Sequence, residues 1–279
     1  MKEQASPAIS PNQALWEKGD FTRIAAAMRE SGEALVKALG IQSGEQVLDL
    51  GCGDGTTAIP AAKLGAHVLG ADISRHLVAA GNRRAADAGL SHCRFEHGDA
   101  SRLSNLGDDS FDRVVSIFGA MFAPNPFDVA REMVRVTRPG GSIAMGNWIP
   151  NDPTLVAQIL KISSAYSPPP PAGFISPVTW GIQSNVEERF MAAGIPASDI
   201  TCSEQVYTFQ FDGSPLAFLD AFRRYYGPTM NAFDAAEKNG RSHELAEELG
   251  ALFTAQNRSA RPDSTSIPAR YLLVTVKVN

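Results

Sequence analysis

The sequence is poor in cysteine and has no excess of positive charge. Its three cysteines, Cys52, Cys93 and Cys202, lie far apart and form no CxxC pair, which argues against a disulfide framework and a zinc knuckle. The 25 Lys and Arg residues are outnumbered by 30 Asp and Glu residues, for a formal net charge of -5. An acidic chain has no general attraction for phosphate backbones or anionic lipid surfaces. We therefore expect reduced thiols and no nucleic-acid partner.

Long apolar runs are absent as well. No window approaches the ~20 uninterrupted apolar residues of a membrane helix, and residues 1–20 lack the apolar centre of a secretion signal. We therefore expect a cytoplasmic protein with no membrane span. With 44% hydrophobic and 20% charged residues over 279 positions, the chain can bury one substantial core with a smaller lobe attached.

Between residues 47 and 149, short apolar runs alternate with stretches of helical spacing. This alternation is typical of βαβ units, so the expected fold class is α/β with a Rossmann-like, mostly parallel sheet and helices on both faces. The predicted strands are Val47–Leu50, His67–Ala71, Cys93–His97, Arg113–Ile117 and Gly141–Trp148. The predicted helices are Thr57–Leu64, Ser74–Ala88 and Phe127–Arg138, the last ending at the turn Arg138-Pro139-Gly140-Gly141.

Composition divides the whole chain into five expected parts. They are an N-terminal helical cap (1–40), a ligand-binding core (41–150), an insertion plus the end of the core sheet (151–211), a helical lid insertion (212–270) and a final core strand (271–279). After residue 150, the proline run Pro168–Pro171 predicts a stiff extended segment. Helices are predicted over Val186–Ala193, Leu216–Tyr226 and Ser242–Asn257, with a break at Gly227-Pro228. Strands are predicted over Ser203–Phe211 and Tyr271–Val278.

A glycine-rich loop after the first predicted strand is the clearest sign of a ligand site. The run from Asp49 to Gly55 reads Asp-Leu-Gly-Cys-Gly-Asp-Gly, and its glycines allow close approach of backbone to a ligand. A dinucleotide loop of the GxGxxG type would need its third glycine at position 56, where the chain has Thr56. The spacing therefore disfavours NAD.

Acidic residues end three successive predicted strands. Asp49 ends the first, Asp72 the second and Asp99 follows the third. The carboxyl ends of parallel strands meet at one edge of the sheet, where such folds bind ligands. A carboxylate at Asp72 can accept from two ribose hydroxyls, and one at Asp99 can accept from an adenine amino group. Their convergence predicts one nucleoside-binding crevice.

The ordered motifs resemble those of class I S-adenosylmethionine-dependent methyltransferases. They are the loop from Asp49 to Gly55, Asp72, Gly98-Asp99-Ala100, the run from Ser110 to Val115, and Arg138-Pro139-Gly140-Gly141. The resemblance covers residues 40 to 150 and is closest to the branch that contains the ubiquinone and menaquinone biosynthesis methyltransferases. It implies a seven-stranded sheet whose last strand, Tyr271–Val278, runs antiparallel between its neighbours.

The resemblance also implies the cofactor, S-adenosyl-L-methionine, and how the core would hold it. The loop from Asp49 to Gly53 would hold the methionine part, with Cys52 acting through its backbone. Asp72 would hold the ribose, and Asp99 and Ala100 would hold the adenine. The backbone from Ser116 to Phe118 would hold the amino end. The expected cofactor residues are Asp49, Gly51, Cys52, Gly53, Asp72, Ile73, Asp99, Ala100, Ser116, Ile117 and Phe118.

Large apolar side chains fall in the N-terminal cap, after the fourth and fifth predicted strands, and in the late insertion. Each of them alone is consistent with core packing, but as a set they predict an apolar or aromatic small-molecule substrate and a pocket to receive it. Tyr225 and Tyr226, just before Gly227-Pro228, are the preferred pair. The expected substrate residues are Trp16, Phe21, Met121, Phe122, Trp148, Tyr225 and Tyr226.

The sequence contains no obvious catalytic base, and Tyr225 and His76 are the two candidates. A metal site at His92, Cys93 and His97 is disfavoured, because a strand points His92 and Cys93 to opposite faces and offers no fourth ligand; we predict no metal. The run Asn125-Pro126-Phe127 lacks one proline of the Asn-Pro-Pro-aromatic signature of amino methyltransferases and comes some eight residues late.

These observations predict an enzyme that transfers a methyl group from S-adenosylmethionine to oxygen, nitrogen or carbon of a small molecule by in-line displacement. Two alternatives remain open. One is a protein that binds S-adenosylmethionine or S-adenosylhomocysteine without catalysis, and the other is an NAD-dependent oxidoreductase on a similar sheet.

Overall fold

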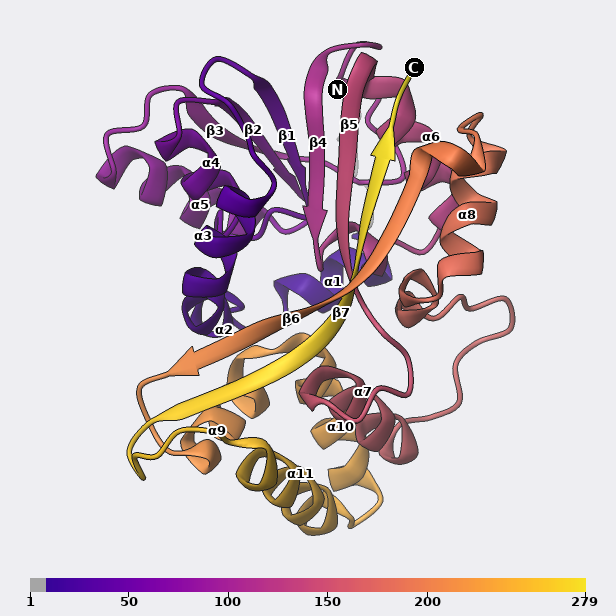
Figure 1. Cartoon of the computed structure of the whole chain (residues 1–279). Helices are drawn as coiled ribbons and strands as arrows, with labels where there is room; N and C mark the ends of the chain where they lie inside the picture. The colour runs from indigo at the N-terminus through magenta and orange to yellow at the C-terminus, as the bar shows by residue number, and fades with distance from the viewer. Residues whose placement is uncertain (1–8) are drawn as a thin grey trace, which may run out of the picture.

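Seven strands form one mixed sheet at the centre of the computed structural model, which describes residues 9–279 (Figure 1). The strand order is β3-β2-β1-β4-β5-β7-β6, and only β7 runs antiparallel to both of its neighbours. The fold class and the antiparallel last strand predicted from the sequence are confirmed. The strands are β1 (Gln46–Leu50), β2 (His67–Asp72), β3 (Cys93–His97), β4 (Phe111–Ile117), β5 (Thr137–Trp148), β6 (Ile200–Phe211) and β7 (Thr265–Lys277).

Helices cover both faces of the sheet because neighbouring strand residues point apolar side chains in opposite directions. In β1, Val47 packs into the apolar cluster beneath the helices α3 (Arg29–Ala38), α4 (Ala58–Lys63) and α5 (Arg75–Asp87). The next residue, Leu48, belongs to the larger cluster that contains residues of α6 (Pro126–Val136) and α8 (Gln183–Ala192). The two groups of helices lie on opposite sides of the strands in Figure 1.

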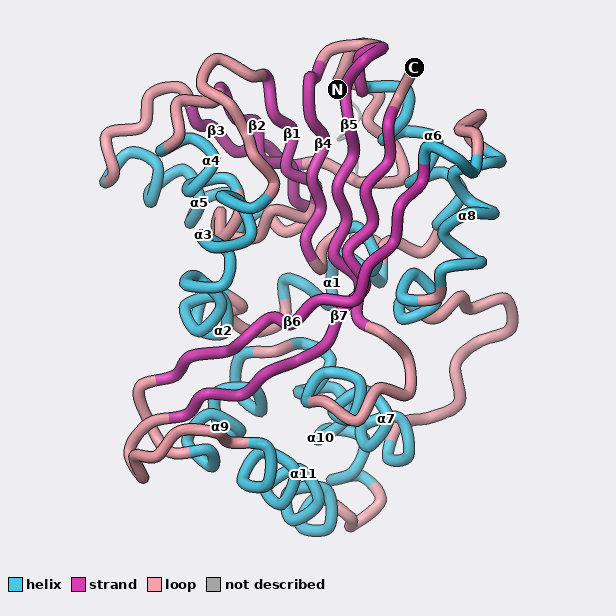
Figure 2. The backbone as a smooth tube through the Cα atoms, in the orientation of Figure 1, coloured by secondary structure: helices cyan, strands magenta, loops and turns pink. Residues whose placement is uncertain are grey.

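Four further helices form a second lobe below the sheet. They are α7 (Leu155–Tyr166), α9 (Pro215–Tyr225), α10 (Gly227–Lys238) and α11 (Ser242–Gln256). Strands β6 and β7 continue out of the sheet as a long two-stranded ribbon that runs over this lobe (Figure 2). Within this lobe, the rings of Phe218 and Phe222 of α9 pack against the ring of Phe253 of α11.

The N-terminal segment lies between the sheet and the second lobe. It forms α1 (Pro11–Glu17), α2 (Thr22–Ala25) and the 3-10 turn η1 (Ala26–Met28). Lys18 Nζ donates to Asn231 Oδ1 of α10 at 2.6 Å, and Glu17 Oε1 accepts from the backbone N–H of Arg75 at 3.2 Å. The segment is thus attached to both lobes. Further 3-10 turns are η2 (Ala120–Phe122), η3 (Pro177–Gly181) and η4 (Ala197–Asp199).

Several element boundaries differ from the predicted ones. The helix predicted over Phe127–Arg138 corresponds to α6, which ends at Val136. Strand β5 starts at the next residue, Thr137. The predicted turn from Arg138 to Gly141 therefore lies inside β5, as an irregularity where Gly140 has a φ of +83°. Strand β7 begins at Thr265, earlier than Tyr271, because its first residues pair with β6 in the ribbon. Strand β6 begins at Ile200, earlier than Ser203, because its first residues pair with β7 inside the sheet.

Helix α10 was missed by the sequence analysis. Gly227-Pro228 was interpreted only as a break, but Pro228 occupies the first turn of a new helix, where its lack of an N–H costs no hydrogen bond. None of the helices formed by residues 9–279 combines the length and hydropathy needed to cross a bilayer.

Candidate functional site

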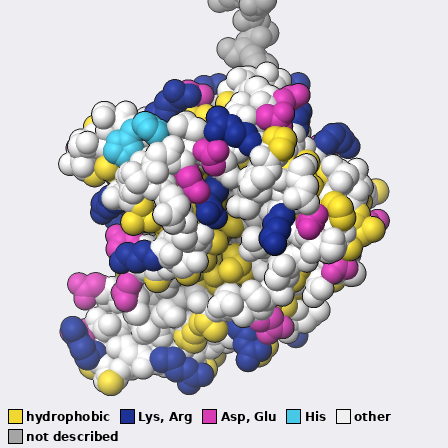
Figure 3. All heavy atoms as spheres, turned by 45° about the horizontal axis from the view of Figure 1, so that its top comes forward, with side chains coloured by type: hydrophobic (Ala, Val, Ile, Leu, Met, Phe, Trp, Pro, Cys, Tyr) yellow, Lys and Arg dark blue, Asp and Glu magenta, His cyan; other side chains and the backbone are white. Residues whose placement is uncertain are grey.

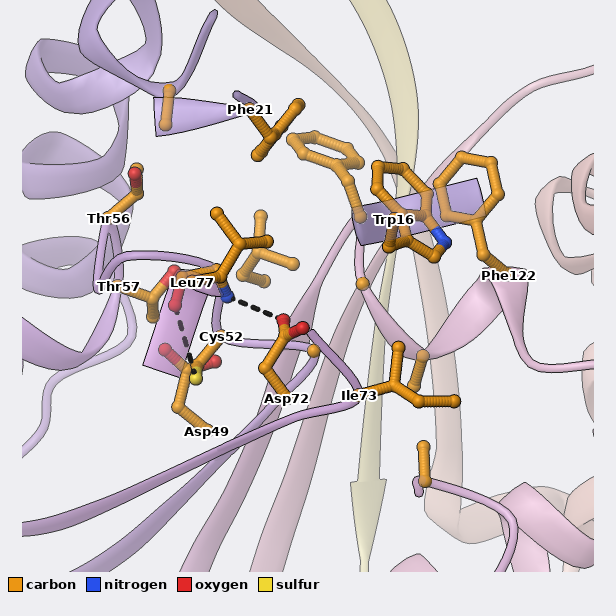
Figure 4. Close-up of a pocket in the computed structure, with 18 of the residues that line it drawn as sticks. Trp16, Phe21, Asp49, Cys52, Thr56, Thr57, Asp72, Ile73, Leu77 and Phe122 are labelled. Atoms are coloured by element: carbon orange, nitrogen blue, oxygen red, sulfur yellow. Dashed lines mark hydrogen bonds between the residues drawn. The ribbon is translucent and has the colours of Figure 1, made fainter. Parts of the chain in front are cut away.

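A crevice opens at the carboxyl ends of β1, β2 and β4 and beside the residues that follow β3. The space between its walls, counted together with the solvent at its open mouth, is about 870 Å³. It lies between the sheet and the N-terminal segment (Figure 4). Ten of the eleven predicted cofactor residues line it, namely Asp49, Gly51, Cys52, Gly53, Asp72, Ile73, Asp99, Ala100, Ile117 and Phe118.

The glycine-rich loop between β1 and α4 needs glycine for two different reasons. At Gly51 (φ +64°), an added Cβ would lie 2.5 Å from the Cα of Gly119, so the loops after β1 and β4 touch there. At Gly53 (φ +56°), an added Cβ would meet nothing nearer than the ring of Phe21 at 3.9 Å. Gly51 thus closes the floor of the crevice, whereas the backbone at Gly53 faces open space that a ligand can approach.

Asp72, at the end of β2, holds this loop in place. Its Oδ2 accepts from the backbone N–H of Gly53 at 2.8 Å (Figure 4), and its Oδ1 accepts from that of Ser74 at 2.8 Å. Burial raises the pKa of the Asp72 carboxyl, although these backbone hydrogen bonds oppose the shift. Each carboxylate oxygen retains acceptor capacity for a donor from the crevice.

Asp49, in β1, is a buried carboxylate with an unmet hydrogen-bonding requirement. It is 1% exposed, and its Oδ2 has no hydrogen-bond partner among residues 9–279. Burial raises the pKa of Asp49 to about 7, with the nearby charge of Asp72 adding to the effect. Asp49 itself borders the crevice, although this oxygen is enclosed by the protein.

Asp54 joins the loop to the helices around it. Its carboxylate is 1% exposed and lies 2.9 Å from Arg29 Nη2 of α3 and 3.3 Å from Arg84 Nη1 of α5. Arg84 also donates to the backbone carbonyl of Asp54. The sequence analysis did not select Asp54 or its partners, because nothing in the sequence indicates which distant arginines would meet it.

The residues after β3 and β4 complete the crevice. Asp99 Oδ1 accepts from the backbone N–H and the hydroxyl of Ser101, at 2.9 and 2.7 Å. Phe118 has a φ of +61°, which is unusual for a residue other than glycine, and its ring stacks on Trp148 with centroids 3.6 Å apart. Ser116 does not line the crevice, and its hydroxyl donates to Leu50 O of β1 and accepts from the N–H of Ala120 in η2.

A second, apolar cavity adjoins the crevice, and we call it the chamber. Its space, counted together with the gaps between side chains and the solvent at its opening, is about 400 Å³. Residues of the N-terminal segment, the sheet, α7 and α9 surround it, so both lobes contribute. Its lining residues are Trp16, Phe21, Ile24, Met28, Phe118, Phe122, Trp148, Val156, Ile159, Phe209, Phe222 and Tyr226.

Five residues line both the crevice and the chamber, so the two cavities meet at a shared wall. They are Trp16, Phe21, Met28, Phe118 and Phe122. Trp16 holds this wall together through edge contacts with Phe122 at 4.9 Å and Phe21 at 5.7 Å between ring centroids. Figure 3 shows apolar side chains gathered in a hollow of the molecular surface.

Five of the seven predicted substrate residues line the chamber, and two do not. Trp16, Phe21, Phe122, Trp148 and Tyr226 border it. Met121 is 1% exposed and belongs to the general core. Tyr225 lines neither cavity, and its ring lies 6.0 Å from the guanidinium carbon of Arg23. The preferred Tyr225 and Tyr226 pair is therefore split, because successive residues at the end of α9 point in different directions.

Neither predicted catalytic candidate, Tyr225 or His76, borders the crevice or the chamber. The side chain of His76 is 47% exposed, and its Nε2 lies 3.9 Å from Asp20 Oδ1. Among residues 9–279, the chamber has no Asp, Glu, His, Cys, Lys or Arg in its lining. The same part of the chain contains no group of three or more potential metal ligands.

Tyr207, in β6, is a crevice residue that the sequence analysis missed. It is 1% exposed, and its hydroxyl donates to the carbonyl of Met28 at 2.7 Å. Burial raises the pKa of this phenol. The alternation over Ser203–Phe211 placed Tyr207 and Phe209 on one face of a strand, but it did not indicate that this face meets the N-terminal segment.

A third cavity, an open groove, extends the crevice on the side of Asp99. It shares Asn12, Asp99 and Phe122 with the crevice. Its outer wall includes Phe174 and Ile175, which are 54% and 42% exposed. The crevice thus adjoins this apolar groove as well as the chamber.

Comparisons of the sequence with known proteins identify a methyltransferase domain and relatives of two kinds. A family described as a methyltransferase domain matches residues 47–141. An uncharacterised protein of Mycobacterium tuberculosis is 35% identical over 232 residues, which cover 83% of this chain and 82% of the relative. A demethylmenaquinone methyltransferase of Halalkalibacterium halodurans is 38% identical over 111 residues, covering 39% of this chain and 45% of that enzyme.

Solved structures share the fold at low sequence identity. The YcgJ protein of Bacillus subtilis superposes with a TM-score of 0.58 at 18% identity, over 90% of this chain and 99% of that one. A phosphoethanolamine N-methyltransferase of Haemonchus contortus, in complex with S-adenosyl-L-methionine, superposes with a TM-score of 0.61 at 16% identity. That match covers 99% of this chain and 62% of the other.

Proposed function

Because the chain belongs to the class I S-adenosylmethionine-dependent methyltransferases, we propose that it methylates a small, uncharged and largely apolar molecule held in the chamber. Its cofactor is S-adenosyl-L-methionine. When bound, this cofactor supplies a methyl group on a sulfonium, which a nucleophile can displace in line. The proposal concerns where the cofactor and the acceptor bind and what kind of acceptor is used.

The residues of the crevice fit this cofactor. Asp49 borders the crevice, and the amino group of the methionine part would place a donor and a positive charge beside its carboxylate. Gly53 presents open backbone beside it. Asp72 would accept from the ribose hydroxyls, and the segment at Asp99 and Ala100 would bind the adenine.

The shared wall of the crevice and the chamber is the observation that carries the proposal. Five side chains border both cavities, so a molecule in the chamber lies next to a cofactor in the crevice. Direct displacement requires the reacting atoms to be held ~3–3.5 Å apart. A cavity that shared no wall with the crevice could not bring an acceptor this close to the methyl group.

The lining of the chamber limits the acceptor. A charged molecule would lose its hydration there without gaining an ionic partner, whereas a flat apolar molecule would bury its surface against aromatic side chains. Among residues 9–279, the chamber lining contains no carboxylate or imidazole to remove a proton. The chain's own contribution to methyl transfer is therefore alignment of the reactants, and the proton lost by a hydroxyl or C–H acceptor would pass to solvent at the mouth of the crevice.

A chamber-filling variant tests the proposal. Ile159→Trp places a larger side chain at a position that lines only the chamber, and Leu160→Trp, on the neighbouring position of α7, enlarges a groove residue as the control. Methyl-labelled S-adenosylmethionine is supplied with a panel of neutral aromatic molecules. We expect labelled product with the wild type and Leu160→Trp and little with Ile159→Trp, at equal S-adenosylhomocysteine affinity. Full turnover by Ile159→Trp would overturn the assignment.

A further inference from the structure

The chamber has uncharged hydrogen-bond donors in an otherwise apolar wall. Tyr226 and Trp148 are 6% and 3% exposed, and both line it. Among residues 9–279, the hydroxyl of Tyr226 and the indole Nε1 of Trp148 make no hydrogen bond. Buried donors of this kind normally have a partner, so a molecule in the chamber can supply the missing acceptor.

Both donor atoms border open space. Neither is among the fully enclosed polar atoms that lack a partner, a group that includes Trp180 Nε1. The two residues are almost completely buried, and the chamber is a cavity that both of them line. The donors also come from different lobes, Trp148 from the end of β5 and Tyr226 from the end of α9.

We infer that Tyr226 Oη and Trp148 Nε1 form a recognition site for a neutral oxygen atom on the acceptor, such as the carbonyl or ether oxygen of a ring compound. This inference rests on the proposed function, because it takes the chamber as the acceptor site. An indole N–H only donates, and a phenol can donate while the ring beside it packs against apolar surface. Together they select oxygen-bearing apolar molecules over hydrocarbons and over cations.

The chemistry of Tyr226 supports a role as donor. Burial raises the pKa of its phenol, so Tyr226 keeps its proton at neutral pH and does not serve as a base. Its ring is fixed by Trp16, Phe21 and Phe222, whose centroids lie 5.3 to 6.0 Å away. A fixed ring holds its hydroxyl in one place, which favours a geometrically specific hydrogen bond. Tyr226 and Trp148 are thus specificity residues for the reaction.

A matched pair of probes tests this site. α-Tetralone and tetralin have the same fused rings and differ by one carbonyl oxygen. Binding of each is measured by titration with S-adenosylhomocysteine at saturation, for the full chain and for Tyr226→Phe and Trp148→Phe. We expect the wild type to prefer α-tetralone by about fivefold, as one net hydrogen bond predicts. In Tyr226→Phe the preference should largely disappear while tetralin affinity stays the same.

A control variant and two contrary outcomes distinguish an error in the recognition site from an error in the acceptor chamber. Tyr166→Phe removes a hydroxyl that donates to Glu248, away from the chamber, and should keep the preference. If the wild type binds both probes equally, or Tyr226→Phe and Trp148→Phe both retain the preference, the recognition site is wrong although the chamber stands. If neither probe binds the wild type, the proposed acceptor chamber itself fails, and this inference fails with it.

Discussion

The guanidinium of Arg29 lies 2.9 Å from the carboxylate of Asp54, which joins the N-terminal helix α3 to the glycine-rich loop. Asp54 is almost fully buried, and Arg84 of α5 is its second cationic partner. The loop is therefore positioned from both sides by charged groups that do not face the chamber. Removal of one partner would leave a buried carboxylate with reduced compensation.

Arg29→Met should lower the free energy of unfolding by about 1–3 kcal/mol, because it leaves Asp54 with one cationic partner. The loosened loop should also bind S-adenosylhomocysteine more weakly. Arg23→Met is the control, since Arg23 pairs with Asp20 at the surface. Urea denaturation and calorimetric titration measure the two effects. Equal stability and affinity in Arg29→Met and wild type would show that the ion pair does not position the loop.

Asp72→Ala should weaken S-adenosylhomocysteine binding by about 2 kcal/mol, roughly thirtyfold, through lost hydrogen bonds to the ribose. It should also lower stability, because Asp72 accepts from the N–H groups of Gly53 and Ser74. Asp87→Ala, on the exposed side of α5, controls for loss of an acidic residue. Calorimetry below the melting transition of the variant gives the affinity. Wild-type affinity in the folded Asp72→Ala protein would remove the ribose assignment.

The cofactor-free protein should lose stability as pH rises from about 4 through 7. The pKa of Asp49 in the folded chain is about 7, against an ordinary value of 3.8, so between these values the folded state holds a proton that the unfolded state has released. Stability from such a raised pKa is complete at low pH and is lost as pH rises through the folded value. The raised pKa of Asp72 acts in the same direction. Thermal melts across this range measure the slope.

Asp49→Asn should flatten that slope and raise the stability of the cofactor-free protein near pH 8, since an amide carries no charge to bury. S-adenosylhomocysteine affinity should rise with pH through about 7 in the wild type, because its ammonium group favours ionised Asp49. The rise should be smaller in Asp49→Asn, while Asp87→Asn should behave as wild type. An identical pH dependence in Asp49→Asn and wild type would exclude Asp49 as the group responsible.

Tyr226→Ala should lower turnover at least tenfold, about 1.4 kcal/mol of barrier, and change S-adenosylhomocysteine affinity less than about threefold. Tyr226 lines the chamber and not the crevice. Tyr225→Ala is the adjacent control and should keep most of the activity, because Tyr225 borders neither cavity. A melting temperature for each variant separates loss of activity from loss of fold. Equal losses in the two variants would contradict the assignment of the chamber.

The crevice was predictable from the sequence because its groups lie at strand ends. Parallel strands bring their carboxyl ends to one edge, so Asp49, Asp72 and Asp99 could be placed together from spacing alone. Tyr207 could not be placed, because its contact with Met28 joins segments that are far apart in sequence. Tertiary packing of this kind leaves no periodic signal.

The chamber was predictable only in part, for a similar reason. Aromatic composition indicated an apolar pocket, but Ile159 and Phe222 enter it from helices whose inner faces depend on how the second lobe docks. Tyr225 and Tyr226 are adjacent and are the same residue type, yet only Tyr226, at the end of α9, lines the chamber. Helix α10 was missed because Pro228 can either end a helix or begin one.

A crystal structure with S-adenosylhomocysteine tests the central claim most directly, namely that the crevice holds the cofactor and the chamber the acceptor. We predict that the sulfur will lie at the shared wall of Trp16, Phe21, Met28, Phe118 and Phe122 and face the chamber, with the ribose at Asp72 and the adenine at Asp99. A sulfur that faces the groove of Phe174 and Ile175, or a ligand bound outside the crevice, would contradict the account.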